Sequence, residues 1–336
     1  MRQSNMELLR IIAMFLVLVV HSDFFSLGAP THEELIVSPL PSVTRLFFES
    51  LSVICVNIFV LLSGWFGIHF SYKGLFKLLF QVFFFKFGVY LGCVLFGVTN
   101  FTISGLLHCM LLDHLGWFIK AYLLLYLLSP VLNSFTYSAS KHQCQIVLIS
   151  FFAFQTIFGF LFDGSVSYIN GGYSIVSFIG LYLLSQYVHR YGLGLHIVEK
   201  ISFLTRLFAF LILLNTAFLA VAKSLDLNYL FDILWTYTNP LVIMSALALL
   251  MIFSKCSFQS KMINKIASYS FAVYLFHTHS IVLDNCFKPQ IQTIYNIYDG
   301  IYCILLIFLV LVAFYVIATL VDLLREFCWL RISSFL

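Results

Sequence analysis

The sequence predicts an all-α protein, a polytopic integral membrane bundle of about ten transmembrane helices with both termini in the cytoplasm. Of the 336 residues, 62% are hydrophobic and only 10% are charged, against roughly 25% charged residues in a soluble domain. Apolar runs near the ~20 residues that span a bilayer recur along the whole chain. The short loops between these runs alternate in charge. A water-soluble fold of this composition is excluded.

The ten expected spans follow one another with short connections. No loop exceeds about twenty residues and no repeat of fixed period is found, which predicts a single membrane domain over residues 1–336 without a fused soluble domain. Segment 101–110 is too short to span and is expected at the interface. The predicted spans are 8–27, 46–66, 75–98, 115–132, 145–162, 173–188, 204–222, 230–253, 266–283 and 301–324.

Charged residues sort to the two sides of this ten-helix scheme. One set of loops is basic, and the positive-inside rule assigns that set to the cytoplasm together with both termini. The other set is mainly acidic. The basic set is Arg2, Lys73, Lys77, Lys141, Arg190, Lys200, Arg206, Lys255, Lys261, Lys265, Arg325 and Arg331; the acidic set is Glu33, Glu34, Asp113, Asp163, Asp226, Asp232, Asp284 and Asp299.

Several function classes find no support in the composition. The net charge of +4 is spread over short loops, so no nucleic-acid partner is expected. The eight cysteines are scattered without a C-x-x-C pair, so neither a disulfide framework nor a metal site is predicted. The histidines of His277-x-His279 would point about 200° apart on one helix, which disfavours a shared metal ion. Membrane lipid is the solvent and first partner of the chain.

The first predicted helix carries two ionisable side chains. Arg10 and His21 are eleven residues apart, which on a helix is three turns plus about 20° of rotation and ~16 Å of rise. Both should project from one face, Arg10 toward the cytoplasm and His21 toward the outside. A histidine with a pKa near ~6.5 can act as general base toward a hydroxyl, and Asp23 would support it. The alternative is a snorkelling arginine and an interfacial histidine.

Other polar groups fall within the predicted spans, where a charge costs at least ~2.5 kcal/mol near the bilayer centre. Glu49 is expected to pair with a facing lysine or to lie near the level of His21. Lys86 is expected to be structural. Trp117 fits an interface anchor or a platform that stacks on an acceptor. Ser63 and Gly64 fit close helix packing.

Four stretches resemble the acyltransferase family 3 membrane O-acyltransferases, in the same order and over nearly the whole chain. The first is NMELLRIIAMFLVLVVH, which contains Arg10 and His21. It is followed by VNIFVLLSGWFG, similar to the second-helix signature of that family. HLGWFIKAYLLLYLLSPVLN and SYSFAVYLFHTHSIV are similar to its fourth and penultimate helices. Each stretch alone is a weak signal, and the four in order are fairly specific.

The resemblance implies an enzyme that moves an acyl group, usually acetyl, from cytoplasmic acetyl-CoA or another acyl-CoA to a hydroxyl of an extracytoplasmic or lipid-linked surface polysaccharide. His21 would be the catalytic histidine and Arg10 would assist donor binding. The donor is a substrate, and no permanently bound cofactor is implied. The location would be the bacterial inner membrane, with a multi-pass chain. A separate glycan-assembly or transferase partner is a further expectation.

The resemblance also suggests roles for residues around the predicted site. Lys73 and Lys77 could meet the phosphates of CoA, although the family usually carries an Arg-x-x-Arg type of motif there. Plain positive-inside lysines are the alternative. Asn57 and His277 are candidates to stabilise the oxyanion of the thioester. His21 would activate the acceptor hydroxyl for direct attack or carry the acyl group transiently.

Two rival functions share a polytopic architecture. A transporter or flippase of a glycan or small molecule often shows inverted repeats and paired broken helices. The sequence shows no repeat, and among the prolines only Pro240 falls well inside a predicted span, while Pro130 is expected to end one. A glycan polymerase or ligase usually has a sizeable outer loop, which is not found here. Both rank below the acyltransferase.

Overall fold

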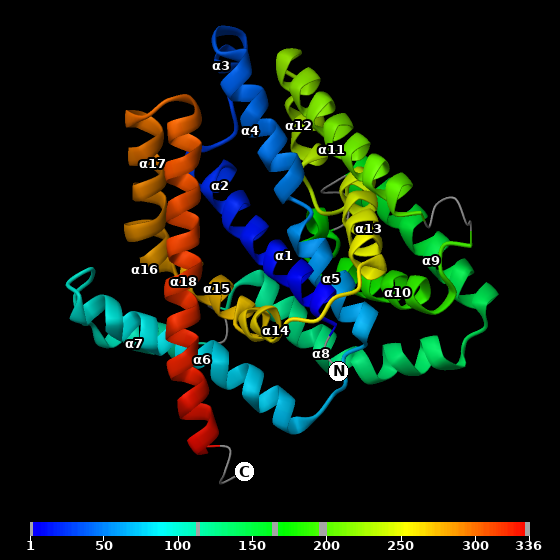
Figure 1. Cartoon of the computed structure of the whole chain (residues 1–336), viewed down its shortest axis with the longest axis horizontal. Coiled ribbons are helices and arrows are strands. Elements are labelled where there is room, and N and C mark those ends of the chain that lie inside the picture. Colours follow the sequence, from blue (N-terminus) through cyan, green and yellow to red (C-terminus); the bar gives the residue numbers. More distant parts are fainter. Residues whose placement is uncertain (1–2, 112–114, 163–166, 195–199, 333–336) are drawn as a thin grey trace. The chain divides into compact units, whose positions relative to one another are not determined.

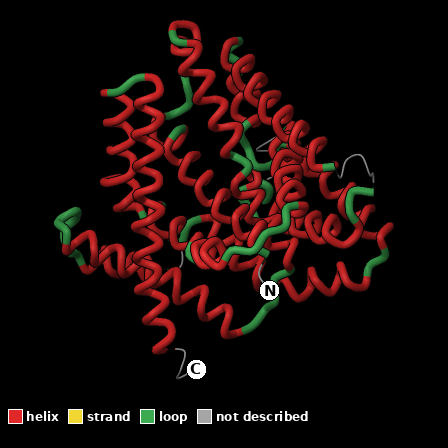
Figure 2. Tube along the Cα trace, in the orientation of Figure 1, coloured by secondary structure: helices red, strands yellow, loops and turns green. Residues whose placement is uncertain are grey.

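The structure is a computed structural model that describes residues 3–111, 115–162, 167–194 and 200–332. The described residues form helices joined by short loops and contain no strand (Figures 1 and 2). The all-helical class is therefore confirmed. Four residues used in the sequence arguments, Arg2, Asp113, His114 and Asp163, lie outside the described residues.

Within the described residues, seven helical segments are long and apolar enough to cross a membrane, and one bent pair would make eight. The helix α10 (Ile175–Tyr191) coincides with the sixth predicted span. The predicted eighth span, 230–253, is wrong as a continuous helix, because α12 (Asn228–Leu234) ends at Leu234 and α13 (Pro240–Lys255) begins only at Pro240. A multi-pass membrane chain is thus supported, while the number ten and the side of the termini stay predictions. The seven segments are Ser4–Leu27, Pro39–Phe66, Tyr72–Leu95, Trp117–Ser138, Lys141–Leu161, Ile201–Ser224 and Gly300–Arg331.

The chain forms two compact units, which are described separately. The first comprises Met1–Leu16, Pro30–Phe70 and Gly116–Ser260. In it α11 packs on α13 and on α4, and α10 packs on α5 and α8. Its helices are the N-terminal part of α1 (Ser4–Ser22), α3 (His32–Val37), α4 (Pro39–Ser52), α5 (Cys55–Phe66), α8 (Trp117–Ser138), α9 (Lys141–Thr156), η2 (Ile157–Leu161), η3 (Asn170–Gly172), α10, α11 (Ile201–Ser224), α12 (Asn228–Leu234) and α13.

Close packing in the first unit depends on Gly64 of α5. A Cβ atom at this position would overlap the backbone oxygen of Tyr182 in α10. Ser185, one turn further along α10, donates its hydroxyl to the carbonyl of Leu61 over 2.6 Å. The predicted packing role of Gly64 is confirmed, because only a residue without a side chain lets the two backbones approach this closely.

The second unit comprises Val17–Ala29, Ser71–Leu115 and Lys261–Leu336. In it α15 packs on α18 and α6, and α17 packs on α2 and α18. Its helices are the C-terminal part of α1, α2 (Phe24–Leu27), α6 (Tyr72–Leu95), α7 (Ile103–Met110), α14 (Lys261–Ser268), α15 (Ser270–His277), α16 (Ser280–Val282), η4 (Leu283–Phe287), α17 (Lys288–Ile297) and α18 (Gly300–Ile332). The short helix α7 matches the stretch that is too short to span.

The predicted ninth span, 266–283, is wrong as a continuous helix. The chain breaks after His277, and the segments on either side, Lys261–His277 and Ser280–Ile297, are bent by 72°. No proline or glycine marks the break. Thr278 instead turns its hydroxyl back to the carbonyl of Tyr274 at 2.6 Å, a local bond that competes with helix continuation. The expectation that His277 and His279 share one helix is therefore wrong as well.

Pro130 and Pro240 lie at positions within their helices that differ from those predicted. Pro130 lies inside α8, which continues to Ser138, and Asn133 beyond it stabilises the extra turn by donating to the carbonyl of Ile68 over 2.9 Å. Pro240 does not interrupt a span, because it occupies the first turn of α13 with Asn239 as N-cap. A proline there is tolerated since the missing N–H would have no helical partner.

Candidate functional site

The two histidines predicted for the site form a pair in the second unit. His21 lies at the end of α1 and His277 at the end of α15. The Nδ1 atom of His21 lies 2.8 Å from the Nε2 atom of His277. His277 is fully buried, whereas His21 is only partly buried. Two residues 256 positions apart in the sequence are thus held in direct hydrogen-bond contact.

Aromatic rings fix the orientation of both imidazoles. Phe25 packs edge-on against His21 with ring centroids 4.9 Å apart, and Phe287 lies 5.8 Å from the His277 ring. The second nitrogen of His277, Nδ1, contacts the carbonyl of Val273 one turn earlier in α15. Both nitrogens of His277 therefore already have partners, and its side chain has no free donor for an oxyanion in this arrangement.

The end of α1 is also fixed by backbone contacts around His21. Ser26 of α2 contacts the carbonyl oxygen of His21 through its hydroxyl, and Gln292 of α17 donates to the carbonyl of Ser26 over 2.8 Å. Asp23 is buried and precedes α2 as its N-cap residue. The contact on the Nδ1 atom of His21 comes from His277, a partner that the sequence arguments did not assign to it.

Arg10 lies in the part of α1 that belongs to the first unit. Its Nη1 atom forms an ion pair of 2.6 Å with Glu7, one turn earlier, and the Arg10 side chain stays 28% exposed. Glu7 was missed in the sequence arguments, although its spacing of three residues from Arg10 is the signal that could have found it. The helix is continuous from Ser4 to Ser22, which confirms that Arg10 and His21 share one helix.

Lys73 and Lys77 occupy the first turns of α6 in the second unit. Both are exposed, and their spacing of four residues places them on one face of the helix. The side chain of Ser71 caps the helix by accepting from the N–H of Gly74 over 3.0 Å. Two ammonium groups at the positive end of a helix form a favourable environment for a phosphate.

Glu49 is fully buried in the first unit, and its carboxyl acts electrostatically on Tyr173 and Tyr237. These tyrosines pack around Trp117, whose ring centroid lies 4.5 Å from that of Tyr173 and 5.8 Å from that of Tyr237. Trp117 therefore belongs to an aromatic cluster. Asn57, also fully buried, donates to the carbonyl of Tyr237 over 3.1 Å. One amide hydrogen of Asn57 is thus already used.

Lys86 of α6 has the structural role predicted for it. Its Nζ atom donates to the carbonyls of His108 and Leu111 over 3.4 Å and 3.3 Å, which caps the end of α7. A lysine is favourable there because the last carbonyls of a helix lack partners. The Nε2 atom of His279 lies 3.3 Å from the Lys86 carbonyl, so His279 contacts another helix.

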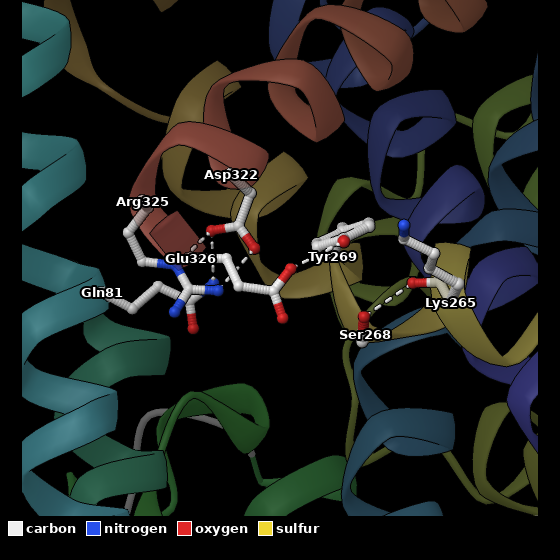
Figure 3. Close-up of polar contacts among 7 residues, drawn as sticks. All are labelled: Gln81, Lys265, Ser268, Tyr269, Asp322, Arg325 and Glu326. Atoms are coloured by element: carbon white, nitrogen blue, oxygen red, sulfur yellow. Dashed lines mark hydrogen bonds and ion pairs between the residues drawn. The ribbon is translucent and has the colours of Figure 1, made fainter. Parts of the chain in front are cut away.

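A second polar cluster in this unit lies around α18 (Figure 3). Arg325 was expected in a cytoplasmic loop, but α18 extends to Ile332 and the residue is only 4% exposed. Its guanidinium donates two hydrogen bonds, of 2.7 Å and 2.9 Å, to the carboxylate of Asp322. Gln81 of α6 donates to the same carboxylate over 3.0 Å. Tyr269 donates to Glu326 over 2.8 Å.

Among the described residues, no group of three or more histidine, cysteine, aspartate or glutamate side chains could hold a metal ion. The imidazole pair offers acid–base chemistry. An unprotonated imidazole nitrogen can accept a proton from a hydroxyl. The buried partner holds the ring in place.

Comparison with known proteins gives one match. The model of the family described as an acyltransferase domain, Acyl_transf_3, matches residues 3–322, nearly the whole chain. No curated protein and no solved structure matches. The matched range includes Arg10, His21 and His277. With its apolar helices, the chain is therefore a multi-pass membrane protein that belongs to the acyltransferase family 3.

Proposed function

We propose that this chain is a membrane O-acyltransferase with a surface polysaccharide as acceptor. It takes an acyl group, acetyl in the first instance, from cytoplasmic acyl-CoA and transfers it to a hydroxyl of an extracytoplasmic or lipid-linked glycan. Its place would be the bacterial inner membrane. The observation that carries this proposal is the His21–His277 pair in a chain of the acyltransferase family.

In direct transfer, His21 takes the proton of the acceptor hydroxyl as its oxygen attacks the thioester carbonyl carbon. The new C–O bond forms, the C–S bond breaks, and the leaving CoA thiolate receives the proton from the His21 imidazolium. The proton is conserved and no further reactant is needed. In the alternative route, the His21 nitrogen attacks the thioester carbonyl carbon, the C–S bond breaks and CoA leaves as the thiolate. The acceptor hydroxyl then attacks the acyl-imidazole, the C–N bond breaks, and the hydroxyl proton goes to the thiolate.

The donor would be held at its phosphates by Lys73 and Lys77, with assistance from Arg10. Both lysines are exposed at the start of α6 and act as point charges that attract phosphate. Arg10 is paired with Glu7 on one side and keeps further N–H groups for another acceptor, since a guanidinium has five donors.

A carrier of glycans is the second candidate because of the bent pair Lys261–His277 and Ser280–Ile297. Broken helices line substrate sites in many transporters, where they usually occur as matched pairs in two repeats. The described part of the chain holds one such pair. This makes the carrier weaker than the enzyme.

The proposal is tested by mass spectrometry of surface glycans from cells that express the wild-type chain, His21→Ala or Arg10→Ala. We expect ester-linked acyl groups with the wild type, none above background with His21→Ala, and a reduced amount with Arg10→Ala. His142→Ala, at an exposed histidine at the start of α9, is the matched control and should behave as wild type. Equal acylation in all four strains would contradict the proposal.

A further inference from the structure

We infer that His277 is the positioning residue of the acyl transfer, which holds His21 in the one tautomer whose Nε2 atom carries the lone pair. The inference deepens the proposed function and rests on it for the consequence in catalysis. The tautomer itself follows from the contacts of the second unit and can be observed without any acyl transfer.

The direction of the hydrogen bonds is set by the carbonyl of Val273. A carbonyl oxygen can only accept, so the Nδ1 atom of His277 that contacts it carries the hydrogen. In a neutral imidazole the other nitrogen is then an acceptor. The Nε2 atom of His277 therefore accepts across the 2.8 Å contact with His21.

His21 has to supply the hydrogen of that contact. Its Nδ1 atom is consequently the protonated nitrogen, and its Nε2 atom is left with the lone pair. The opposite tautomer of His21 would place two lone pairs 2.8 Å apart, with one buried nitrogen on each ring unsatisfied. The carbonyl of Val273 thus selects the basic nitrogen of His21 through His277, in the way that a second group usually fixes the tautomer of a histidine.

The same bond persists after His21 accepts a proton. The His21 imidazolium still donates from Nδ1 to the Nε2 atom of His277, and the bond becomes charge-assisted and stronger. Passing the Nδ1 proton on to Nε2 of His277 would move the positive charge to a ring that is fully buried, and burial disfavours a charged group. The charge therefore stays on His21, whose Nε2 proton is available for the leaving thiolate.

Burial makes His277 a suitable fixed partner. His277, Val273 and Phe287 are each fully buried, at 0% exposure, and α15 packs on α18 and α6. The chain breaks directly after His277. His21 is the less buried member of the pair, so we place the substrate at His21 and the orienting role at the fully buried His277.

Two substitutions distinguish the effect of the hydrogen-bond acceptor on His277 from the effect of the size of its ring. His277→Gln can place its amide oxygen near the position of Nε2 and accept from His21. His277→Phe keeps a ring of similar size but offers no acceptor. Loss of a group that orients a functional imidazole typically costs ten- to a hundredfold. We expect His277→Phe to lower acyl transfer by about that factor and His277→Gln to recover part of it.

The tautomer of His21 is determined by solid-state NMR of the full chain, labelled with ¹⁵N-histidine, in lipid bilayers. Subtracting the spectrum of His21→Gln identifies the ring nitrogens of His21. We expect a protonated Nδ1 and an unprotonated Nε2 in the wild type and in His277→Gln. In His277→Phe we expect the Nε2–H form to appear. Circular dichroism and gel filtration in detergent check that each variant folds.

A wild-type spectrum with hydrogen on the Nε2 atom of His21 would overturn the inference. So would an unchanged acylation rate in folded His277→Phe. If no glycan acylation is found with the wild type while the expected tautomer is present, the proposed function fails and the assigned tautomer stands. The two failures are therefore distinguishable.

Discussion

The second unit contains two polar clusters that differ in which of their polar atoms remain without a partner inside the cluster. In the cluster around α18, Asp322 and Arg325 carry opposite charges and bind each other through two bonds. In the histidine pair, the bonds run in one direction, from His21 to His277 and on to Val273. In the first arrangement the two opposite charges neutralise each other. The second arrangement ends in the Nε2 atom of His21, which does not take part in the contact with His277.

The comparison shows why burial of polar groups alone does not identify a reactive site. The buried ion pair lies within α18 and is linked to α6 through Gln81, and removing a single partner of a buried pair is strongly destabilising. A chain of neutral hydrogen bonds can instead orient one basic atom at its end. The α18 cluster should therefore affect stability, and the histidine pair should affect the reaction.

The largest effect is expected for His21→Asn, which removes the base. Initial rates of acyl transfer in membranes should fall about 10²–10⁴-fold, the usual contribution of a general base. Adding His277→Phe should cause no further loss, because residues that act as a unit are not additive. Losses that multiply in the double variant would contradict a shared role.

The second-largest effect is expected for Asp322→Ala, which should lower the stability of the folded chain. It leaves the buried Arg325 without its partner, which typically costs about 3–5 kcal/mol. The measurement is unfolding of the purified chain in mixed micelles with increasing denaturing detergent. Replacing both residues, with Asp322→Leu and Arg325→Met, should be close to neutral. Wild-type stability of Asp322→Ala would show that the cluster does not hold the unit together.

Gln81→Leu removes one hydrogen bond from the same carboxylate and keeps the ion pair. A bond to a charged group contributes about 1.5–3 kcal/mol, so the free energy of unfolding should fall by about that amount. Gln290→Leu, at an exposed glutamine of α17, is the control and should change stability by less than about 0.5 kcal/mol. Equal effects of the two variants would show that the hydrogen bond from Gln81 to Asp322 does not stabilise the chain.

The smallest effects are expected for Lys73→Gln and Lys77→Gln, which lie outside both clusters. Each exposed charge should contribute about 0.2–1 kcal/mol, so the KM for acetyl-CoA should rise a few-fold with kcat unchanged. The difference from wild type should shrink at high salt because exposed charges are screened. Lys261→Gln is the matched exposed lysine. If it raises KM equally, the effect reflects general surface charge.

The class of the fold could be predicted from the sequence because lipid imposes it. Every span has to satisfy its own backbone and present apolar side chains, and both requirements are visible in a single chain. Arg10 and His21 could be placed on one helix for the same reason, since α1 runs without interruption. Gly64 could be assigned to packing from its small size.

The partners of these residues could not be predicted, because they are set by tertiary contact. Nothing near His21 in the sequence points to His277, which lies 256 residues away. The break after His277 has no proline or glycine to mark it in the sequence, and at this position the Thr278 hydroxyl bonds back to the carbonyl of Tyr274. Asp322 and Arg325 are different, since their spacing of three residues was a readable signal. It was missed because the last helix was predicted to end at residue 324.

The proposed function requires His21 for transfer of an acyl group from a donor on one side of the membrane to a glycan on the other. It is tested most directly with inside-out vesicles from expressing cells, supplied externally with [¹³C₂]acetyl-CoA. We predict ¹³C-acetyl esters on the enclosed glycan with the wild-type chain and none above background with His21→Asn. Equal label in both would contradict the account.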